Sequence, residues 1–391
     1  MFIAKVFFLG YGPISLNCYL FAQPYINPKT SIFASMVHNF NAGPAVLPQE
    51  VLEQAAEAVR NFNGTGLSLL EIGHRTPPFI AVMDEARALV KELMQLSNRH
   101  QVLLLHGGAT LQFQQVPQNL LPRNGVAAYT ETGTWSNKAI KEAALFGRVE
   151  IAGSSRNTNY TSLPHHLEIP DHAAYLHITS NETIAGTQWQ QMPYDAGVPL
   201  VADMSSDILS RSLHFNRFDL IYAGAQKNIG AAGVTLVVVN EDVLGKVPEP
   251  LPTLMDYRNH IREGSMLNTP PVFAVYVVLL NLRWLKAQGG VAAMEARNRE
   301  KADLLYQTLD AQTLFQLPVA KEDRSRMNVV FTLPDERLEA EFLERCKAEQ
   351  LYGVKGHRSV GGFRISLYNA LPLSSVQVAA SLISDFAQKK G

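Results

Sequence analysis

Cysteine is nearly absent from this 391-residue chain, which has only Cys18 and Cys346. Two cysteines make neither a disulfide framework nor a cysteine cluster of the kind that holds a metal ion. We interpret both as free thiols in a reducing compartment. We therefore expect a cytoplasmic protein without a metal centre.

An excess of charge of one sign is also missing. The chain has 34 Lys and Arg residues against 35 Asp and Glu residues, a formal net charge of -1. Proteins that bind nucleic acid usually carry a basic excess, so we expect no nucleic-acid partner and predict small-molecule ligands. The length is sufficient for two domains with a substantial core.

The start of the chain lacks an apolar run long enough to cross a membrane. Residues 1–35 are rich in Phe, Leu, Ile and Tyr and superficially resemble a secretory signal, but Gly10 and Pro13 interrupt them. An orderly pattern begins just after Met36, in residues 38–48. We treat residues 1–35 as a doubtful N-terminal extension, expect translation to begin at Met36, and expect no membrane partner.

Strand-like apolar runs alternate with helical patterns over the next 240 or so residues. Strands are expected at 101–105, 125–130, 149–152, 174–178, 200–203, 220–223 and 234–239, and helices at 49–61, 78–96, from 111, 136–145 and 272–287. This alternation predicts an α/β fold, a mostly parallel sheet with helices on both faces. Ligands of such sheets gather at the carboxyl ends of the strands.

The pattern changes near residue 290. Strands are expected at 327–333 and 363–367, and helices at 291–309, 336–349 and from 374. We predict a large cofactor-binding domain over residues 49–290 and a small α+β C-terminal domain over residues 291–391, with residues 36–48 packing against the small domain. No Gly/Ser-rich linker separates them, so we expect tight packing.

A lone lysine among small residues is the most informative feature. Lys227 lies in the run Tyr222-Ala-Gly-Ala-Gln-Lys-Asn-Ile-Gly230, between two strand-like segments. A lysine on a poorly solvated turn loses hydration, so its amine can become nucleophilic near neutral pH and form a Schiff base. An ordinary surface lysine is the alternative.

Asp203 ends an apolar strand and complements this lysine. Alone it could be an ordinary strand-end cap. A lysine for an aldehyde and an aspartate for a pyridinium nitrogen together favour pyridoxal 5'-phosphate as the cofactor. Asp203 would keep the ring protonated as an electron sink, and Lys227 would carry a proton as general acid and base.

Three further motifs follow strands. The run His106-Gly-Gly-Ala-Thr110 opens a helix and suits a phosphate, although two glycines more often make a turn. Trp135 could stack on a flat ring or belong to a core. Thr183 could donate to the cofactor's ring oxygen or cap a helix.

Two basic loops suggest a substrate pocket. Residues 73–76 contain His74 and Arg75, and residues 355–364 contain several basic residues and no acid. A basic loop is usually just solvated, but arginine forks match carboxylate and phosphate groups bidentately.

Six ordered blocks give the chain from about Met36 to Gly391 a strong resemblance to the phosphoserine aminotransferases, which are class V, fold-type I pyridoxal phosphate enzymes. The blocks are Phe40-Asn-Ala-Gly-Pro44-Ala-Val-Leu-Pro, Glu71-Ile-Gly-His-Arg75, Asp203-Met-Ser-Ser-Asp-Ile-Leu-Ser-Arg211, Tyr222 to Gly230, Gly264-Ser-Met-Leu-Asn-Thr-Pro-Pro271 and Lys355-Gly-His-Arg358.

The resemblance implies a set of cofactor contacts. Lys227 matches the Schiff-base lysine, and Asn268 and Thr269 match residues that reach the cofactor phosphate from the neighbouring subunit. A homodimer with shared active sites is therefore expected. The cofactor-binding positions are Ala109, Thr110, Trp135, Thr183, Asp203, Gln226, Lys227, Asn268 and Thr269, and Lys227 and Asp203 are also catalytic.

The resemblance also implies how substrate is held. Arg75, beside His74, would bind the carboxylate or phosphate of the bound acid, and His357, Arg358 and Arg364 would bind the substrate phosphate. Some relatives carry arginine where this chain has Thr110, so one phosphate-binding charge of the family is missing here.

The implied reaction is transamination between L-glutamate and 3-phosphohydroxypyruvate, which gives 2-oxoglutarate and O-phospho-L-serine for serine biosynthesis. Amination of 3-hydroxy-2-oxo-4-phosphooxybutanoate in pyridoxine biosynthesis is a second expected activity. The alternatives are another class V enzyme, of the serine–glyoxylate or cysteine desulfurase type, and a non-catalytic pyridoxal phosphate binder.

Overall fold

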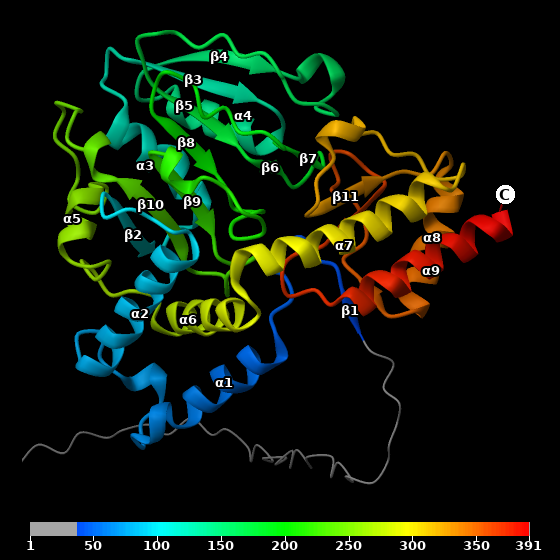
Figure 1. The fold of residues 1–391 in the computed structure, drawn as a ribbon, viewed down its shortest axis with the longest axis horizontal. Coiled ribbons are helices and arrows are strands. Elements are labelled where there is room, and N and C mark those ends of the chain that lie inside the picture. Colours follow the sequence, from blue (N-terminus) through cyan, green and yellow to red (C-terminus); the bar gives the residue numbers. More distant parts are fainter. Residues whose placement is uncertain (1–36, 391) are drawn as a thin grey trace, which may run out of the picture. The chain divides into compact units, whose positions relative to one another are not determined.

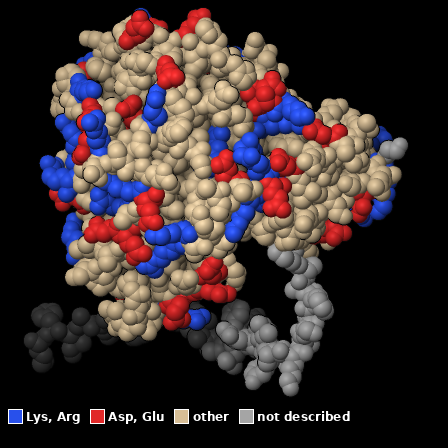
Figure 2. Space-filling model, in the orientation of Figure 1, with Lys and Arg blue, Asp and Glu red and all other residues tan. Residues whose placement is uncertain are grey.

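The computed structural model describes residues 37–390. The predicted N-terminal extension, residues 1–35, lies outside the described residues. Within the described range no helix combines the length and apolar character needed to cross a membrane. On the face drawn in Figure 2, basic and acidic side chains are interspersed, in keeping with a net charge near zero.

A seven-stranded sheet organises the first part of the fold (Figure 1). In spatial order its strands are β2 (His100–Leu105), β10 (Thr235–Asn240), β9 (Leu220–Gly224), β8 (Leu200–Asp203), β5 (Ala173–Thr179), β3 (Val126–Glu131) and β4 (Arg148–Ser154). β10 runs antiparallel to both β2 and β9, and all other adjacent pairs are parallel. The predicted mostly parallel sheet is confirmed.

Helices cover both faces of this sheet because alternate strand residues point to opposite sides. In β8, Leu200 and Ala202 belong to one core, whereas Val201 belongs to a second. The first core contains α1 (Gln49–Arg60), α2 (Pro77–Leu93), α6 (Val272–Ala287) and the start of α7 (Gly290–Asp310), and the second contains α3 (Gly108–Leu120), α4 (Thr134–Ala143) and α5 (Tyr257–Arg262).

A third core lies in the C-terminal part. Its elements are α7 (Gly290–Asp310), β11 (Asn328–Phe331), α8 (Glu336–Ala348), β12 (Leu351–Tyr352), β13 (Phe363–Ser366) and α9 (Leu373–Lys390). β11 pairs with β13, and β1 (His38–Asn39) pairs with β12 while Phe40 joins this core. α7 packs against α6 and along α9 (Figure 1). The domain boundaries stay a prediction.

The differences from the sequence-based expectations are local. α3 begins at Gly108, not at residue 111, because Gly107 adopts a φ of 100° as its N-cap. Ala109 and Thr110 therefore lie inside the first helical turn. The short β1, the hairpin of β6 (Asn181–Glu182) and β7 (Thr187–Gln188), and α5 were not predicted, because two-residue strands and one-turn helices carry no periodicity.

Candidate active site

A cavity of about 280 Å³ lies where β5 and β8 end, beside the connection from β9 to β10. Parallel strands bring their carboxyl ends to one edge, so residues from distant parts of the sequence meet there. Nine predicted site residues line it, namely Ala109, Thr110, Trp135, Thr183, Asp203, Gln226, Lys227, His357 and Arg364.

Lys227 lies in the connection between the antiparallel strands β9 and β10, residues 225–234. Its Nζ donates a hydrogen bond to Thr183 Oγ1 at 2.7 Å and lies 5.7 Å from the centre of the Trp135 ring. Burial lowers the pKa of this amine to about 8, and the negative charge of Asp203 partly opposes the shift. A substantial fraction of Lys227 is therefore neutral near pH 8, as a nucleophile requires.

Asp203 is the last residue of β8 and is only 5% exposed. Burial raises the pKa of its carboxyl group, while the Ser205 amide, which donates to Oδ1 at 2.9 Å, lowers it. A carboxylate held at this depth favours a cationic partner, as a protonated pyridine nitrogen would be.

Trp135 lies in the first turn of α4, and a buried carboxylate holds that turn in place. Glu182 accepts hydrogen bonds from the backbone amides of Trp135 at 3.3 Å and Ser136 at 3.0 Å. A Cβ at Gly133 would lie 2.6 Å from the Glu182 carboxyl carbon, so glycine leaves room for this contact. Burial raises the Glu182 pKa to about 7.

The N-terminus of α3 opens on the same cavity through Gly108, Ala109 and Thr110. The first amides of a helix have no partner within the helix and carry partial positive charge, so they favour an anion. Gly107 adopts a φ of 100°, which residues with a side chain rarely adopt, so the turn that aims these amides favours glycine.

Arg364 and His357 line the cavity from the C-terminal part, and the guanidinium of Arg364 brings positive charge to it. Arg364 Nη1 donates to the Thr183 carbonyl at 3.4 Å, and its Nε is buried without a partner. Burial, followed by the charges of Arg364 and Arg358, lowers the His357 pKa. The two side chains suit an anionic group of a ligand.

The sequence is similar to known proteins over nearly the whole described range. The aminotransferase class-V family matches residues 37–378. A phosphoserine aminotransferase of Flavobacterium johnsoniae is 54% identical over 353 residues, which cover 90% of this chain and 99% of that protein. Another, of Parabacteroides distasonis, is 51% identical over 354 residues, with coverage of 90% and 99%.

This chain belongs to the class-V aminotransferases. Within them it belongs to the phosphoserine aminotransferase family.

Solved structures agree with this membership. The phosphoserine aminotransferase from Bacillus circulans subsp. alkalophilus has a TM-score of 0.89 and 43% identity, covering 91% of this chain and 99% of that one. The enzyme from Trichomonas vaginalis, solved with pyridoxal phosphate bound, has a TM-score of 0.84 and 36% identity, covering 89% and 99%. The predicted fold type of the family is therefore confirmed.

Five residues that the family resemblance implicates do not line the cavity, namely His74, Arg75, Arg358, Asn268 and Thr269. Arg75, Arg358 and Thr269 are exposed. Asn268 Nδ2 lies 2.6 Å from His106 Nε2, just before α3. Their roles stay predictions.

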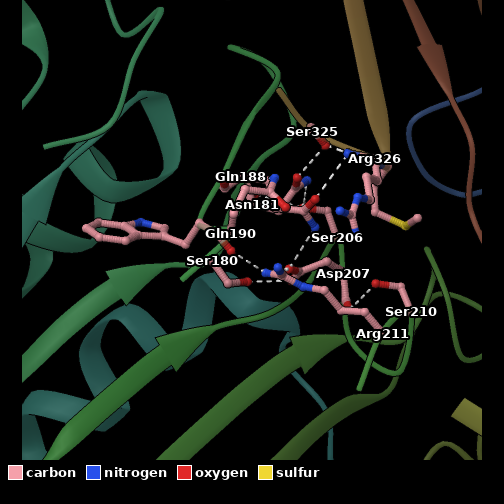
Figure 3. A network of polar contacts seen from close by, with 12 residues as sticks. Ser180, Asn181, Gln188, Gln190, Ser206, Asp207, Ser210, Arg211, Ser325 and Arg326 are labelled. Atoms are coloured by element: carbon pink, nitrogen blue, oxygen red, sulfur yellow. Dashed lines mark hydrogen bonds and ion pairs between the residues drawn. The ribbon is translucent and has the colours of Figure 1, made fainter. Parts of the chain in front are cut away.

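Behind the cavity, the family block that begins at Asp203 forms a buried ion pair (Figure 3). Asp207 accepts hydrogen bonds from Ser180 Oγ, from Gln188 Nε2 at 3.2 Å and from Arg211 Nη2 at 3.2 Å. Ser180 Oγ also contacts the Asp203 carbonyl at 3.0 Å. This block therefore contains Asp203 and also Asp207, which is linked through Ser180 to the Asp203 backbone.

Asn181 extends this network to the C-terminal part (Figure 3). Its Nδ2 donates to Ser206 Oγ and to Asn328 Oδ1, both at 2.8 Å, and its Oδ1 accepts from Ser325 Oγ. Sequence reasoning missed Glu182, Asp207 and Asn181. The available signal was a run of polar residues directly after buried strands.

The residues around the cavity fit pyridoxal phosphate. An amine of lowered pKa suits the aldehyde, a buried carboxylate suits the ring nitrogen, and unpaired helix amides suit the phosphate. Thr179 Oγ1 and Arg364 Nε are buried beside the cavity without a partner, so a polar ligand would satisfy them. Among residues 37–390 no group of three His, Cys, Asp or Glu side chains could hold a metal ion.

Proposed function

We propose that this chain catalyses the reversible transamination of 3-phosphohydroxypyruvate with L-glutamate, giving O-phospho-L-serine and 2-oxoglutarate for L-serine biosynthesis. The observation that carries the proposal is the arrangement of Lys227, Asp203 and the N-terminus of α3 around one cavity. The chain's membership of the phosphoserine aminotransferases supplies the substrate class.

The cofactor is pyridoxal 5'-phosphate. When bound, it supplies an aldehyde that takes up an amino group and a ring that withdraws electrons from the substrate's α-carbon. Lys227 would hold the aldehyde, Asp203 the ring nitrogen and the amides of Ala109 and Thr110 the phosphate. The remaining contacts of this protomer would come from Trp135, Thr183 and Gln226.

Lys227 is the proton carrier of the proposed reaction. Once the substrate's amino group has displaced Lys227 from the aldehyde, the freed neutral amine, with its pKa of about 8, would take the proton from the substrate's α-carbon, and the resulting ammonium would return one. Thr183 Oγ1 accepts a hydrogen bond from Nζ and orients it. Asp203 is the buried counter-charge that stabilises positive charge in the cavity.

Arg364, His357 and Arg358 would bind the phosphate of the substrate. Arg364 lies in the cavity wall with Nε free of protein partners, and Arg358 lies on the exposed loop beside His357. A planar guanidinium matches a phosphate or carboxylate with two parallel hydrogen bonds.

A second copy of the chain would complete the site. We assign His74 and Arg75 to substrate binding, and Asn268 and Thr269 to the cofactor phosphate, in a homodimer with shared active sites in the cytoplasm. Support comes from their position outside this protomer's cavity and from the family resemblance. The second, pyridoxine-pathway substrate stays a prediction.

A half-reaction assay tests the proposed function. Purified protein loaded with cofactor is mixed with O-phospho-L-serine, L-serine or L-alanine, and the cofactor absorbance is followed. Phosphoserine should convert the cofactor far faster than the unphosphorylated amino acids. Equal rates with serine would favour a serine–glyoxylate enzyme, and no conversion by any amino acid would favour a non-catalytic binder.

The desulfurase alternative finds no support at Cys346. This residue is buried in α8, and burial raises the pKa of its thiol to about 12. A nucleophilic cysteine needs a lowered pKa and access to substrate. Cys18 lies outside the described residues.

A further inference from the structure

A buried lysine lies outside the cavity, in α7. Lys301 is 2% exposed, and its Nζ donates to the backbone carbonyls of Leu367 at 2.9 Å, Tyr368 at 2.8 Å and Leu371 at 3.2 Å. Among residues 37–390 no carboxylate lies within 4 Å of this amine. A lysine ammonium has three protons, and three carbonyls accept them, so the group is satisfied without an ion pair.

The three carbonyls belong to the turn between β13 and α9, residues 367–371, which contacts the segment that carries Lys227. The backbone amide of Asn369 donates to Asn228 Oδ1 at 3.0 Å, and Asn228 is next to Lys227. The Asn369 side chain donates to the Leu209 carbonyl at 3.0 Å. The turn therefore holds the lysine segment by contacts that do not enter the cavity.

The same turn also holds a second segment that lines the cavity. Tyr368 donates from its hydroxyl to the Ala42 carbonyl at 2.9 Å, and Ala42 and Gly43 line the cavity. A Cβ at Gly43 would lie 3.1 Å from Lys227 Cγ, so this loop packs directly on the lysine side chain. Neighbouring residues of one turn thus fix two segments that meet at Lys227.

This turn is anchored to the support network behind the cavity as well. Asn298, one helical turn before Lys301, donates from Nδ2 to Asn369 Oδ1 at 2.8 Å and to the Ser210 carbonyl at 2.9 Å. Asn228 Nδ2 contacts the Ser206 carbonyl at 3.5 Å. Ser206 and Ser210 lie in the polar network of Figure 3.

We propose that Lys301 is a positioning residue for Lys227, which acts by locking the turn at residues 367–371 so that Asn369 and Tyr368 hold the two segments around the active-site lysine. The proposal rests on the proposed function of Lys227. Burial lowers the Lys301 pKa to about 7, the cost of placing an amine where no carboxylate compensates it. A methionine would avoid that cost but would leave three carbonyls unpaired.

A double-mutant cycle tests the coupling. Lys301→Met, Asn228→Ala and the double variant are compared at a temperature where circular dichroism finds each fully folded. Two rates are measured: attachment of pyridoxal phosphate to Lys227 in cofactor-free protein, and kcat for phosphoserine. Lys301→Met should reduce both rates about tenfold, because misplacing Lys227 should cost about as much as losing one hydrogen bond. The KM for phosphoserine should stay within about twofold of the wild-type value. The double variant should be no slower than the slower single one.

Cys346→Ala is the matched control, because Cys346 is buried in the same core but makes none of these hydrogen bonds. It should lower stability without changing either rate. Unchanged rates in folded Lys301→Met, or effects that multiply in the double variant, would overturn the proposal. If Lys301→Met does not fold, Lys301→Gln, which keeps two donors, replaces it in the same cycle. A wild-type protein that attaches the cofactor but does not use phosphoserine would refute the proposed function alone, since the attachment rate still reports on Lys301.

Discussion

Lys227 and Thr183, 44 residues apart in the sequence, are joined by a hydrogen bond of 2.7 Å from Nζ to Oγ1. Thr183 follows directly on Glu182, whose carboxylate holds the amides of α4 beside Trp135. The active-site lysine is therefore oriented by the same segment that fixes the aromatic ring of the cavity. Its surroundings decide both its direction and its pKa.

The lowered pKa of Lys227 predicts a pH dependence. Only the neutral amine attacks an aldehyde, and half of it is neutral at about pH 8, whereas an unperturbed lysine requires a pH above about 10. The rate of pyridoxal phosphate attachment to cofactor-free protein should rise about tenfold per pH unit below this value and level off above it. Stopped-flow absorbance between about pH 6 and about pH 10 measures it.

Asp203→Asn provides the control for this titration. The charge of Asp203 raises the Lys227 pKa, so its removal should move the midpoint to lower pH. A wild-type rate that keeps rising steeply up to pH 10, or a midpoint that moves upward in the variant, would contradict the assignment.

Replacing the lysine tests its role in turnover. Lys227→Ala should abolish the absorbance band of the lysine-attached cofactor and the overall reaction, because no other amine lines the cavity among the described residues. Lys138→Ala is the control, since Lys138 lies 4.5 Å from the Trp135 ring centre but outside the cavity lining. It should remain active, and full activity of Lys227→Ala would refute the mechanism.

Removing the buried carboxylate of Asp203 should weaken cofactor binding. Asp203→Ala is expected to lose about 1.5–3 kcal/mol of a charge-assisted hydrogen bond, or about tenfold to a hundredfold in cofactor Kd, and to slow proton abstraction. Equilibrium dialysis gives the Kd. The control variant Asp195→Ala changes an exposed aspartate and should bind the cofactor as the wild type does. Equal Kd values for the two variants would show that Asp203 does not belong to the cofactor site.

Arg358 is assigned to the phosphate, so its removal should discriminate between substrates. Arg358→Ala is expected to raise KM for 3-phosphohydroxypyruvate much more than KM for glutamate, because a guanidinium contributes most to a dianionic group. Steady-state kinetics with each substrate varied in turn measure both constants. Arg337→Ala, an exposed change on α8, serves as the control. An equal rise of both KM values would place Arg358 elsewhere.

The main elements of the fold were predictable because their signals are local. The apolar run of β8 and the continuous helical pattern of α6 were predicted at the bounds that the structure has, residues 200–203 and 272–287. Runs of apolar residues bounded by polar ones report burial directly. β1 and β12, two residues each, form a pair only because the chain returns to the same place some 310 residues later.

The residues of the candidate site were likewise predictable where a local sequence signal marks them. Asp203 ends a strand, and Lys227 and Trp135 each follow one. Because the carboxyl ends of parallel strands meet, their convergence in one cavity follows from the fold class. The side chains that hold these site residues in place were not predictable. Nothing near Glu182 in the sequence indicates that its carboxylate caps α4, and nothing near Lys301 indicates that it organises a turn 66 residues away.

By itself, then, the sequence determined the alternation of strands and helices and the chemistry carried by each strand end, since both depend on residues that are neighbours in the chain. Only the tertiary structure decided which polar groups hold Lys227, because buried donors and acceptors find partners according to distance in space. It likewise decided the pKa of that lysine, which depends on burial among segments that the sequence keeps far apart.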